Sequence, residues 1–142
     1  KCYADRLTGV DLSPEMLKQA RDRNIYDELL ESEVAACMRV RPNTFDLIIA
    51  VDVFCYIGDL TDTLNAARVA LKPAGHLLFS VEAQSTRGYS LTGSGRYAHK
   101  PAYIRRTAKS AGFHEILSSR ETLRTEYGAP VAGYLTALQK LG

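Results

Sequence analysis

The stretch FDLIIAVDVF, residues 45–54, constrains the fold most strongly. It is the most hydrophobic segment of the chain, and its isoleucine and valine residues follow one another without the polar alternation of a half-exposed strand. Such a run is typical of a central strand in a parallel sheet, which is covered on both faces. The sequence therefore predicts an α/β fold with this strand near the middle of its sheet.

Shorter apolar runs and helical patterns surround this strand. Three further strands are predicted at residues 7–12, 29–34 and 76–83. Four helices are predicted at residues 14–24, 35–40, 60–71 and 101–111. Two β-like runs joined by a turn close the chain, at residues 113–123 and 131–139. The order predicts a Rossmann-like, doubly wound, mostly parallel sheet with an antiparallel C-terminal strand pair.

Length, charge and cysteine content limit the functions that are possible. We expect the 142 residues to form a single domain, 1–142, and because the sequence starts with Lys1 we expect it to begin inside a larger one. A net charge of +2 gives no reason to expect nucleic acid or a membrane as partner, and leaves the oligomeric state open. The odd, widely spaced set Cys2, Cys37 and Cys55 is typical of reduced thiols in a cytoplasmic protein, and no Cys/His cluster suggests a metal.

Acidic residues stand at or near the ends of the predicted strands. Ligands of doubly wound sheets bind at the carboxyl ends of the strands, where a carboxylate such as Asp11 can accept the hydroxyls of an adenosine ribose. Glu33 could accept from an adenine amino group, although Glu31 is a rival and a solvated acid is an equal alternative. Asp52 lies in the hydrophobic run, where an acid must be paired or face a cleft.

Three segments together resemble the motifs of class I S-adenosylmethionine-dependent methyltransferases. They are GVDLSPEML, FDLIIAVDVFCYI and LKPAGHLLFSVE, and GRYAHKPAYIRRTAKSAGF resembles the small-molecule type often linked to tetratricopeptide repeats. The resemblance implies a methyltransferase domain that binds S-adenosyl-L-methionine and transfers its methyl group to a small-molecule or protein acceptor. It also implies the positions of the cofactor-binding residues, which are Asp11, Leu12, Met16, Glu33, Val34, Ala50, Val51 and Asp52.

The sequence departs from this family at two places. The family's first strand and glycine-rich turn, about 20 residues before the ribose acid, have no counterpart, so we expect the chain to lack them. The segment after the hydrophobic run, Asp52 to Tyr56, contains no Pro-Pro pair, which argues against the branch that methylates nucleobase or glutamine nitrogens.

The acceptor side is predicted from the polar stretch 84–100, which reads as a long loop. His99 and Tyr56 are the candidates for a catalytic base, with a surface histidine and a packed tyrosine as the alternatives. Candidate substrate-binding residues in the same stretch are Tyr89, Arg96 and Tyr97, unless the loop is simply flexible. Cys55 is expected to be a buried small apolar residue rather than a nucleophile.

Two other classes of protein share parts of this pattern. A nicotinamide-dependent Rossmann oxidoreductase would also place an acid at a strand end, but it normally adds a Tyr-x-x-x-Lys or His-Asp element. Tyr97 and Lys100 are only three positions apart and do not supply that spacing. A noncatalytic α/β interaction or scaffold domain would need no cofactor turn, and it remains the other alternative.

Overall fold

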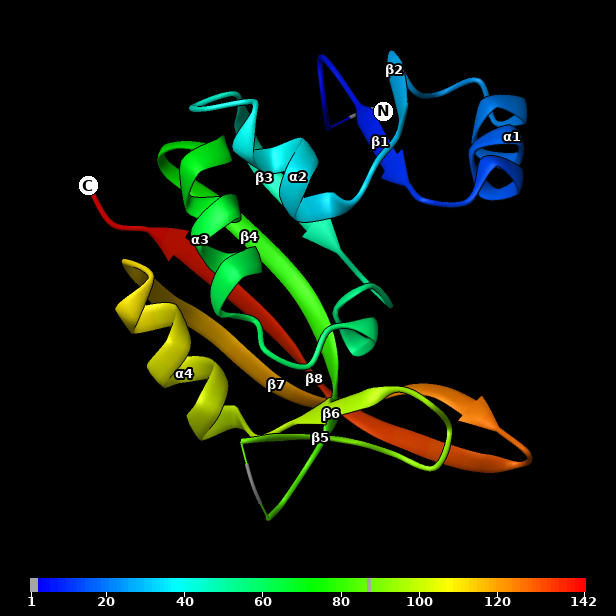
Figure 1. Cartoon of the computed structure of the whole chain (residues 1–142), viewed down its shortest axis with the longest axis vertical. Helices are drawn as coiled ribbons and strands as arrows, with labels where there is room; N and C mark the ends of the chain where they lie inside the picture. The colour runs from blue at the N-terminus through cyan, green and yellow to red at the C-terminus, as the bar shows by residue number, and fades with distance from the viewer. Residues whose placement is uncertain (1–2, 87) are drawn as a thin grey trace.

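The computed structural model describes residues 3–86 and 88–142. Its strands are β1 (Thr8–Asp11), β2 (Glu28–Glu31), β3 (Phe45–Ala50), β4 (Leu71–Ala83), β5 (Tyr89–Leu91), β6 (Tyr97–His99), β7 (Phe113–Glu126) and β8 (Ala129–Lys140). Its helices are α1 (Pro14–Asp22), α2 (Val34–Arg39), α3 (Thr61–Ala70) and α4 (Pro101–Ser110), with one short 3₁₀-helix at Phe54–Tyr56. Strands and helices alternate as far as β4, and a long hairpin closes the chain (Figure 1).

The larger sheet is built on β4. Its strand order is β5-β6-β4-β8-β7, and β3 pairs with β4 on the edge that β4 also presents to β6. The pairs of β4 with β3 and β6 are parallel, whereas β8 pairs with β4 and with β7 in the antiparallel direction. The expected antiparallel pair at the C-terminus is therefore confirmed, but the sheet is mixed rather than mostly parallel.

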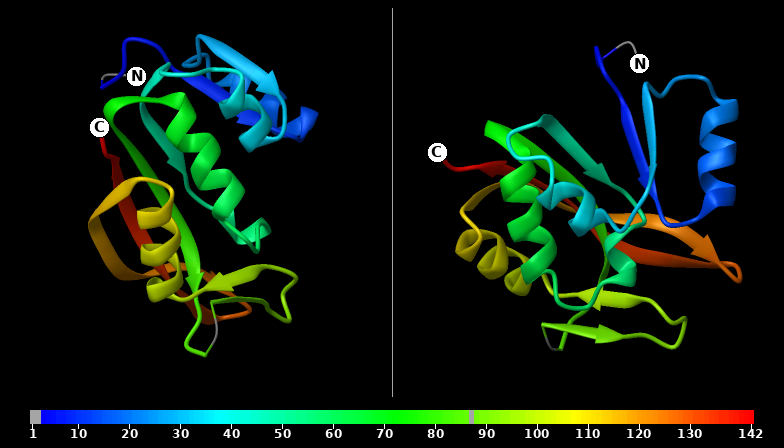
Figure 2. Two further views of the ribbon diagram at one scale, coloured as in Figure 1. Left: turned by 60° about the vertical axis from the view of Figure 1, so that its left-hand side comes forward. Right: turned by 45° about the horizontal axis from the view of Figure 1, so that its top comes forward.

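A second, smaller sheet contains only β1 and β2. These strands are parallel, with Gly9 opposite Leu29 and Asp11 opposite Glu31. Helix α1 packs on both strands, apart from the other three helices (Figure 2). A Cβ atom at Gly9 would lie 2.7 Å from Leu29 Cδ2, so close side-chain packing against β1 favours glycine at this position.

The hydrophobic core lies between β4 and helices α3 and α4. Leu77, Phe79 and Val81 of β4 are fully buried, and the ring of Phe54 lies 4.9 Å from that of Phe79. The opposite face of the larger sheet is uncovered by helices within residues 3–86 and 88–142, so Leu47 and Ile49 of β3 remain 51% and 59% exposed. The prediction that β3 is a central strand covered on both faces is therefore wrong for the described part of the chain, where β3 pairs only with β4. The doubly wound arrangement stays a prediction.

Two sequence predictions placed element boundaries wrongly near the site. Strand β3 ends at Ala50 rather than at residue 54, because Asp52 adopts a positive φ of 58° and turns the chain. Residues 84–100 are not a plain loop, since they contain the β5–β6 hairpin, whose second strand continues the larger sheet beside Glu82 and Ala83. Both differences place side chains at the carboxyl end of β4.

Candidate functional site

The turn between β1 and α1 orients Asp11. Ser13 caps the helix by accepting a hydrogen bond from the Met16 amide at 3.3 Å, and Pro14 takes the first helical position. The Ser13 amide donates to Asp11 Oδ1 at 2.8 Å. Within the described residues, Asp11 Oδ2 has no hydrogen-bond partner, so one carboxylate oxygen at the end of β1 is available to a ligand.

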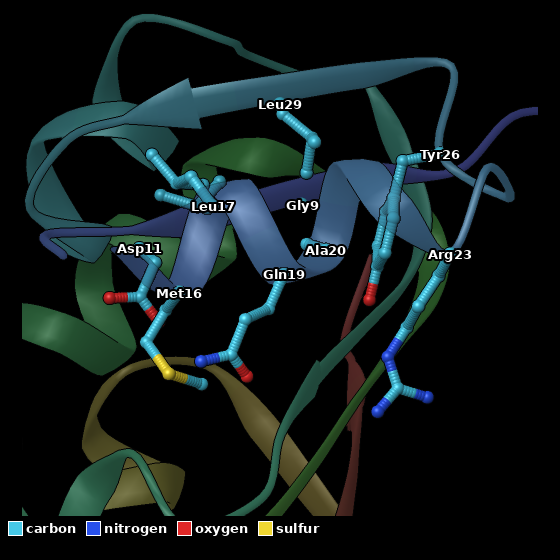
Figure 3. Close-up of a pocket in the computed structure, with 10 residues that line it drawn as sticks. Gly9, Asp11, Met16, Leu17, Gln19, Ala20, Arg23, Tyr26 and Leu29 are labelled. Atoms are coloured by element: carbon cyan, nitrogen blue, oxygen red, sulfur yellow. The ribbon is translucent and has the colours of Figure 1, made fainter. Parts of the chain in front are cut away.

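A pocket of about 300 Å³ lies between α1 and β1. Asp11 and Met16 lie side by side at one end of it, and Tyr26 and Arg23 lie at the other (Figure 3). Met16 is 50% exposed and Leu12 is 67% exposed, although both side chains are apolar. An acid with a free oxygen beside two exposed apolar side chains suits a ligand that has both a hydroxylated and a flat apolar part.

Glu33 occupies a different place from the one that the sequence predicts. Strand β2 ends at Glu31, and Glu33 is the N-cap of α2. Its two oxygens accept hydrogen bonds from the amides of Ala35 and Ala36, at 2.9 and 2.7 Å. Val34 begins α2 and packs against the core. Glu31, the rival acid, is exposed and lies opposite Asp11 in the β1–β2 register.

The chain turns sharply after β3 and exposes Asp52. Ala50 is buried, whereas Val51 is exposed and Asp52 is half exposed. The Asp52 amide donates to Ser80 Oγ of β4 at 3.0 Å, which holds the positive-φ residue in place. Cys55 lies behind this turn, and burial together with Asp52 raises the pKa of its thiol to about 11. Cys55 is therefore a buried neutral thiol, as the sequence predicts, and not an activated nucleophile.

Arg124 of β7 connects three carboxylates at the ends of different strands. Its guanidinium pairs with Glu82 at the end of β4, with Asp52 at 3.4 Å and with Glu126 at 2.7 Å. The Arg124 side chain is only 20% exposed. Hydrogen bonds from Arg124, assisted by Arg96, hold the pKa of Glu126 below its ordinary value. One cation thus ties β3, β4 and the β7–β8 hairpin together next to Asp52.

Tyr56 and Arg96 come together although they are 40 positions apart. An Arg96 nitrogen donates to the Tyr56 hydroxyl at 3.3 Å, and the guanidinium carbon lies 5.7 Å from the centre of the ring. Arg96 also forms an ion pair with Glu126. Tyr56, predicted as a catalytic candidate, and Arg96, predicted to bind substrate, therefore belong to one surface, where the cation already has two partners.

His99 lies away from this surface. It is fully buried in β6, and its Nε2 donates to the carbonyl of Gly58 at 2.9 Å, while Nδ1 is buried without a partner. Tyr89 and Tyr103 pack around the imidazole, and Tyr97 contacts Tyr89 edge-on. The interpretation of His99 as a histidine in an open loop that serves as a base is wrong, because neither ring nitrogen is accessible.

Three residues of this region were missed by sequence reasoning. Glu82 is the last residue but one of β4 and could have been found by the strand-end rule that singled out Asp11. Arg124 and Glu126 could not have been found in this way. Arg124 pairs with Glu82, 42 positions away, and Glu126 pairs with Arg96, 30 positions away.

Other kinds of site are not seen in the described residues. No group of three or more His, Cys, Asp or Glu residues within 3–86 and 88–142 is arranged to hold a metal ion. Across the same residues, none of the helices combines the length and the apolar character needed to cross a membrane. Cys37 and Cys55 are free and buried, whereas Cys2 lies outside the described residues.

Solved structures with a similar fold cover almost the whole chain. The structure of an S-adenosylmethionine-dependent methyltransferase from Listeria monocytogenes, described as putative, superposes with a TM-score of 0.77 at 17% identity, over 98% of this chain and 82% of that one. An N1-methyltransferase from Burkholderia thailandensis with bound 1,6-didemethyltoxoflavin and S-adenosylhomocysteine has a TM-score of 0.71 at 18% identity, over 96% and 62%. The 4+2 cyclase SpnF superposes with a TM-score of 0.78 at 14% identity, over 96% of this chain and 67% of that one. These likenesses show the fold alone.

Sequence comparison adds the family. Malonyl-acyl-carrier-protein O-methyltransferase of Halalkalibacterium halodurans is 28% identical over 155 aligned positions, which cover 96% of this chain and 56% of the relative. The chain thus spans about half the length of this curated relative. A family model described as a methyltransferase domain matches residues 1–79, which include β1, the pocket beside α1, Asp52 and most of β4. The chain belongs to the methyltransferase-domain family.

Proposed function

We propose that this chain is an S-adenosylmethionine-dependent methyltransferase domain that transfers a methyl group to a small-molecule or protein acceptor. The observation that carries the proposal is the free carboxylate oxygen of Asp11 at the carboxyl end of β1, beside an open pocket with exposed apolar walls. This is the chemistry that an adenosine ribose requires. Family membership through residues 1–79 supports it, because the matched segment contains the same strand end.

The residues fit the adenosine end of the cofactor best. Asp11 Oδ2 would accept a ribose hydroxyl, with Leu12 and Met16 against the base. Ala50, Val51 and Asp52 would line the path of the methionine part, since the turn after β3 faces outward. Glu33 and Val34 are weaker candidates for the adenine contact, because both Glu33 oxygens already cap α2. The Burkholderia neighbour, described with S-adenosylhomocysteine bound, supports this choice of cofactor.

The cofactor would supply an electrophilic methyl group on a sulfonium. The chain would then have to hold an acceptor in line with that methyl group and limit access of water. Asp52 has its amide hydrogen-bonded to Ser80 at a positive φ and its carboxylate paired with Arg124, and it would orient groups at the end of β3. Tyr56 stays the candidate for handling an acceptor proton, because its hydroxyl is exposed and hydrogen-bonded to Arg96.

The finer assignments are also proposals. The type often linked to tetratricopeptide repeats is supported by the GRYAHKPAYIRRTAKSAGF segment, which forms β6 and α4. A cytoplasmic location is supported by the free thiols of Cys37 and Cys55. A single domain over residues 1–142 is supported by the continuous core of α3, α4 and β4.

A calorimetric titration with S-adenosylhomocysteine tests the proposal. We expect saturable binding to the full chain, and loss of at least about tenfold in affinity in Asp11→Ala, because a charge-assisted hydrogen bond is removed. Asp22→Ala is the matched control, since Asp22 is an exposed carboxylate at the far end of α1, the helix that follows Asp11, and this variant should bind as the wild type does. Absence of binding, or an equal loss in both variants, would contradict the proposed cofactor site.

A further inference from the structure

An open cleft lies between the tips of two hairpins. The β5–β6 hairpin contributes Gly93, Ser94, Gly95 and Arg96, and the β7–β8 hairpin contributes Glu126 and Tyr127. Tyr56 completes the wall, and the cleft measures about 790 Å³, a size that holds a small organic molecule. In Figure 1 the two hairpins extend side by side beyond the carboxyl end of β4. Asp52 is linked to this wall through Arg124, which also binds Glu126.

The charges of the wall do not suit an anionic ligand. Arg96 is paired with Glu126, and Arg124 is paired with Glu82, Asp52 and Glu126. Two cations against three carboxylates leave a net charge of −1 in the network. A ligand carboxylate or phosphate would have to displace one of these pairs and face the remaining acids. The cleft therefore favours an uncharged ligand, and Arg96 does not act as the free anion receptor that its sequence position suggested.

Two exposed tyrosines give the cleft an aromatic surface. Tyr56 is 60% exposed although Arg96 stands over its ring. Tyr127 is fully exposed and takes a positive φ of 48° in a two-residue turn, where asparagine or glycine is the usual choice. A large aromatic side chain at a position that strains its backbone is a sign of function rather than of folding. Flat rings bind well between such side chains.

Glu126 offers the cleft a hydrogen-bond acceptor. Both of its ion pairs use Oε1, and within the described residues Oε2 has no partner. Because the pKa of Glu126 is held low, this carboxylate stays ionised and is a weak base. It can orient a hydroxyl group by accepting its hydrogen bond, but it is poorly suited to remove the proton. A hydroxyl that is itself acidic matches this environment better than an aliphatic alcohol does.

We propose that the cleft binds an uncharged planar ring that carries a hydroxyl group, a phenol-type molecule, as the methyl acceptor. The proposal rests on the proposed methyltransferase function. In the reaction, the hydroxyl oxygen forms a bond to the methyl carbon of the cofactor while the carbon–sulfur bond breaks. The electron pair of that bond stays on sulfur, and the hydroxyl proton leaves to solvent water.

The test is a ligand-observed NMR titration of the full chain with two probes of the same shape, para-hydroxybenzamide and para-hydroxybenzoate, at about pH 7, where only the second carries a carboxylate. The neutral probe should bind at least about tenfold more tightly than the anionic one, because the network already has an excess carboxylate. Equal binding, or tighter binding of the anionic probe, would overturn the proposal.

Three variants and one control locate the binding. Tyr56→Ala should weaken para-hydroxybenzamide about tenfold, whereas Tyr56→Phe keeps the ring and most of the affinity. Tyr3→Ala is the control, because Tyr3 is fully exposed and is not among the residues of the cleft. Glu126→Gln should narrow or reverse the preference between the probes, since it removes one acid and frees Arg96. An unchanged preference in Glu126→Gln would contradict the charge argument.

Because the probes are titrated without cofactor, the two proposals can fail separately. Binding of S-adenosylhomocysteine without binding of para-hydroxybenzamide would refute the phenol cleft and leave the methyltransferase proposal standing. If para-hydroxybenzamide binds and S-adenosylhomocysteine does not, the proposal that the cleft is a methyl acceptor site is refuted. When both ligands bind, nuclear Overhauser contacts from the ring of para-hydroxybenzamide to Tyr56 should persist in the ternary complex.

Discussion

The proposed site has two ends, a cofactor end around Asp11 and an acceptor end around Arg124 and Tyr56, and they are built in different ways. Around Asp11, the geometry depends on neighbours in sequence, because Ser13 bonds to Asp11 and to Met16 within one turn. Around Arg124, every strand end is held by a residue distant in sequence, apart from Glu126. Burial differs in the same direction, since β1 has no buried residue whereas Leu77, Phe79 and Val81 of β4 are fully buried.

This difference suggests that one end is suited to the cofactor and the other to the acceptor. A local turn that needs little tertiary support can present the carboxylate for a cofactor on an open strand pair. An acceptor surface, in contrast, must hold side chains from several strands in one arrangement, and a partly buried ion network provides that fixation at the cost of desolvating its charges. We therefore expect substitutions at the two ends to affect different properties of the protein.

The largest effect is expected for Arg124→Met. Removal of the shared cation leaves Glu82 and Asp52 without their ion-pair partner, whereas Glu126 keeps its pair with Arg96. The free energy of unfolding should fall by about 3 kcal/mol, the lower end for breaking a buried pair, because the guanidinium keeps some contact with solvent. Urea unfolding followed by circular dichroism measures the change. Affinity for S-adenosylhomocysteine should change less than in Asp11→Ala if the two ends are independent.

Arg105→Met provides the matched control for this loss. Arg105 also pairs with a glutamate of β7, Glu115, at 3.2 Å, but its side chain is 61% exposed. Exposed pairs of this kind contribute about 0–1 kcal/mol. If Arg124→Met lost no more stability than Arg105→Met, the network would not be what fixes the acceptor end.

The same contrast explains what could be predicted from the sequence. Strand β1 and the Ser13 cap follow from local sequence pattern, and the structure confirms them. The run at β3 forms a strand as predicted, but within the described residues it pairs only with β4 and is half exposed, because its place in the sheet depends on the rest of the fold. The β5–β6 hairpin was missed because its strands have only three residues each, and because β5 pairs with β6 and β6 in turn with the distant β4. Glu33 was placed at a strand end instead of a helix cap, since a boundary error of two residues decides between those roles.

His99 should make the stability of the folded chain depend on pH. Burial lowers the pKa of its imidazole below the ordinary value of 6.5, so near neutral pH the folded protein keeps it uncharged. As the pH falls below about 6.5, the unfolded chain takes up a proton that the folded chain does not. Stability is therefore complete above that pH and is lost below it, by at most about 1.4 kcal/mol per pH unit. Urea unfolding between about pH 7.5 and 5 measures the slope.

Other titratable groups around His99 keep their charge in this pH range. The pKa of Tyr103 is raised by burial, so its phenol stays neutral there, and that of Asp59, which accepts from Tyr103, is lowered by hydrogen bonds from Thr61. Glu126 starts to lose its contribution only as the pH falls below its ordinary pKa of 4.5. In His99→Gln the slope of the unfolding free energy against pH should decrease by the contribution of one histidine. An unchanged slope would mean that other groups cause the pH dependence.

The smallest effect, and the sharpest test of the comparison, is expected for Ser13→Ala. Loss of the cap should destabilise α1 by about 1 kcal/mol, which is about a fivefold faster amide exchange. If the β1–α1–β2 unit opens by itself, this acceleration will be confined to α1 and its two strands, and the amides of β4 will exchange at the wild-type rate. Ser32→Ala is the control, because Ser32 precedes α2 and Glu33, not Ser32, caps that helix. Equal acceleration in α1 and β4 would mean that both ends unfold as one cooperative unit. The stability of the Asp11 turn would then depend on the core, although its hydrogen bonds are local in sequence.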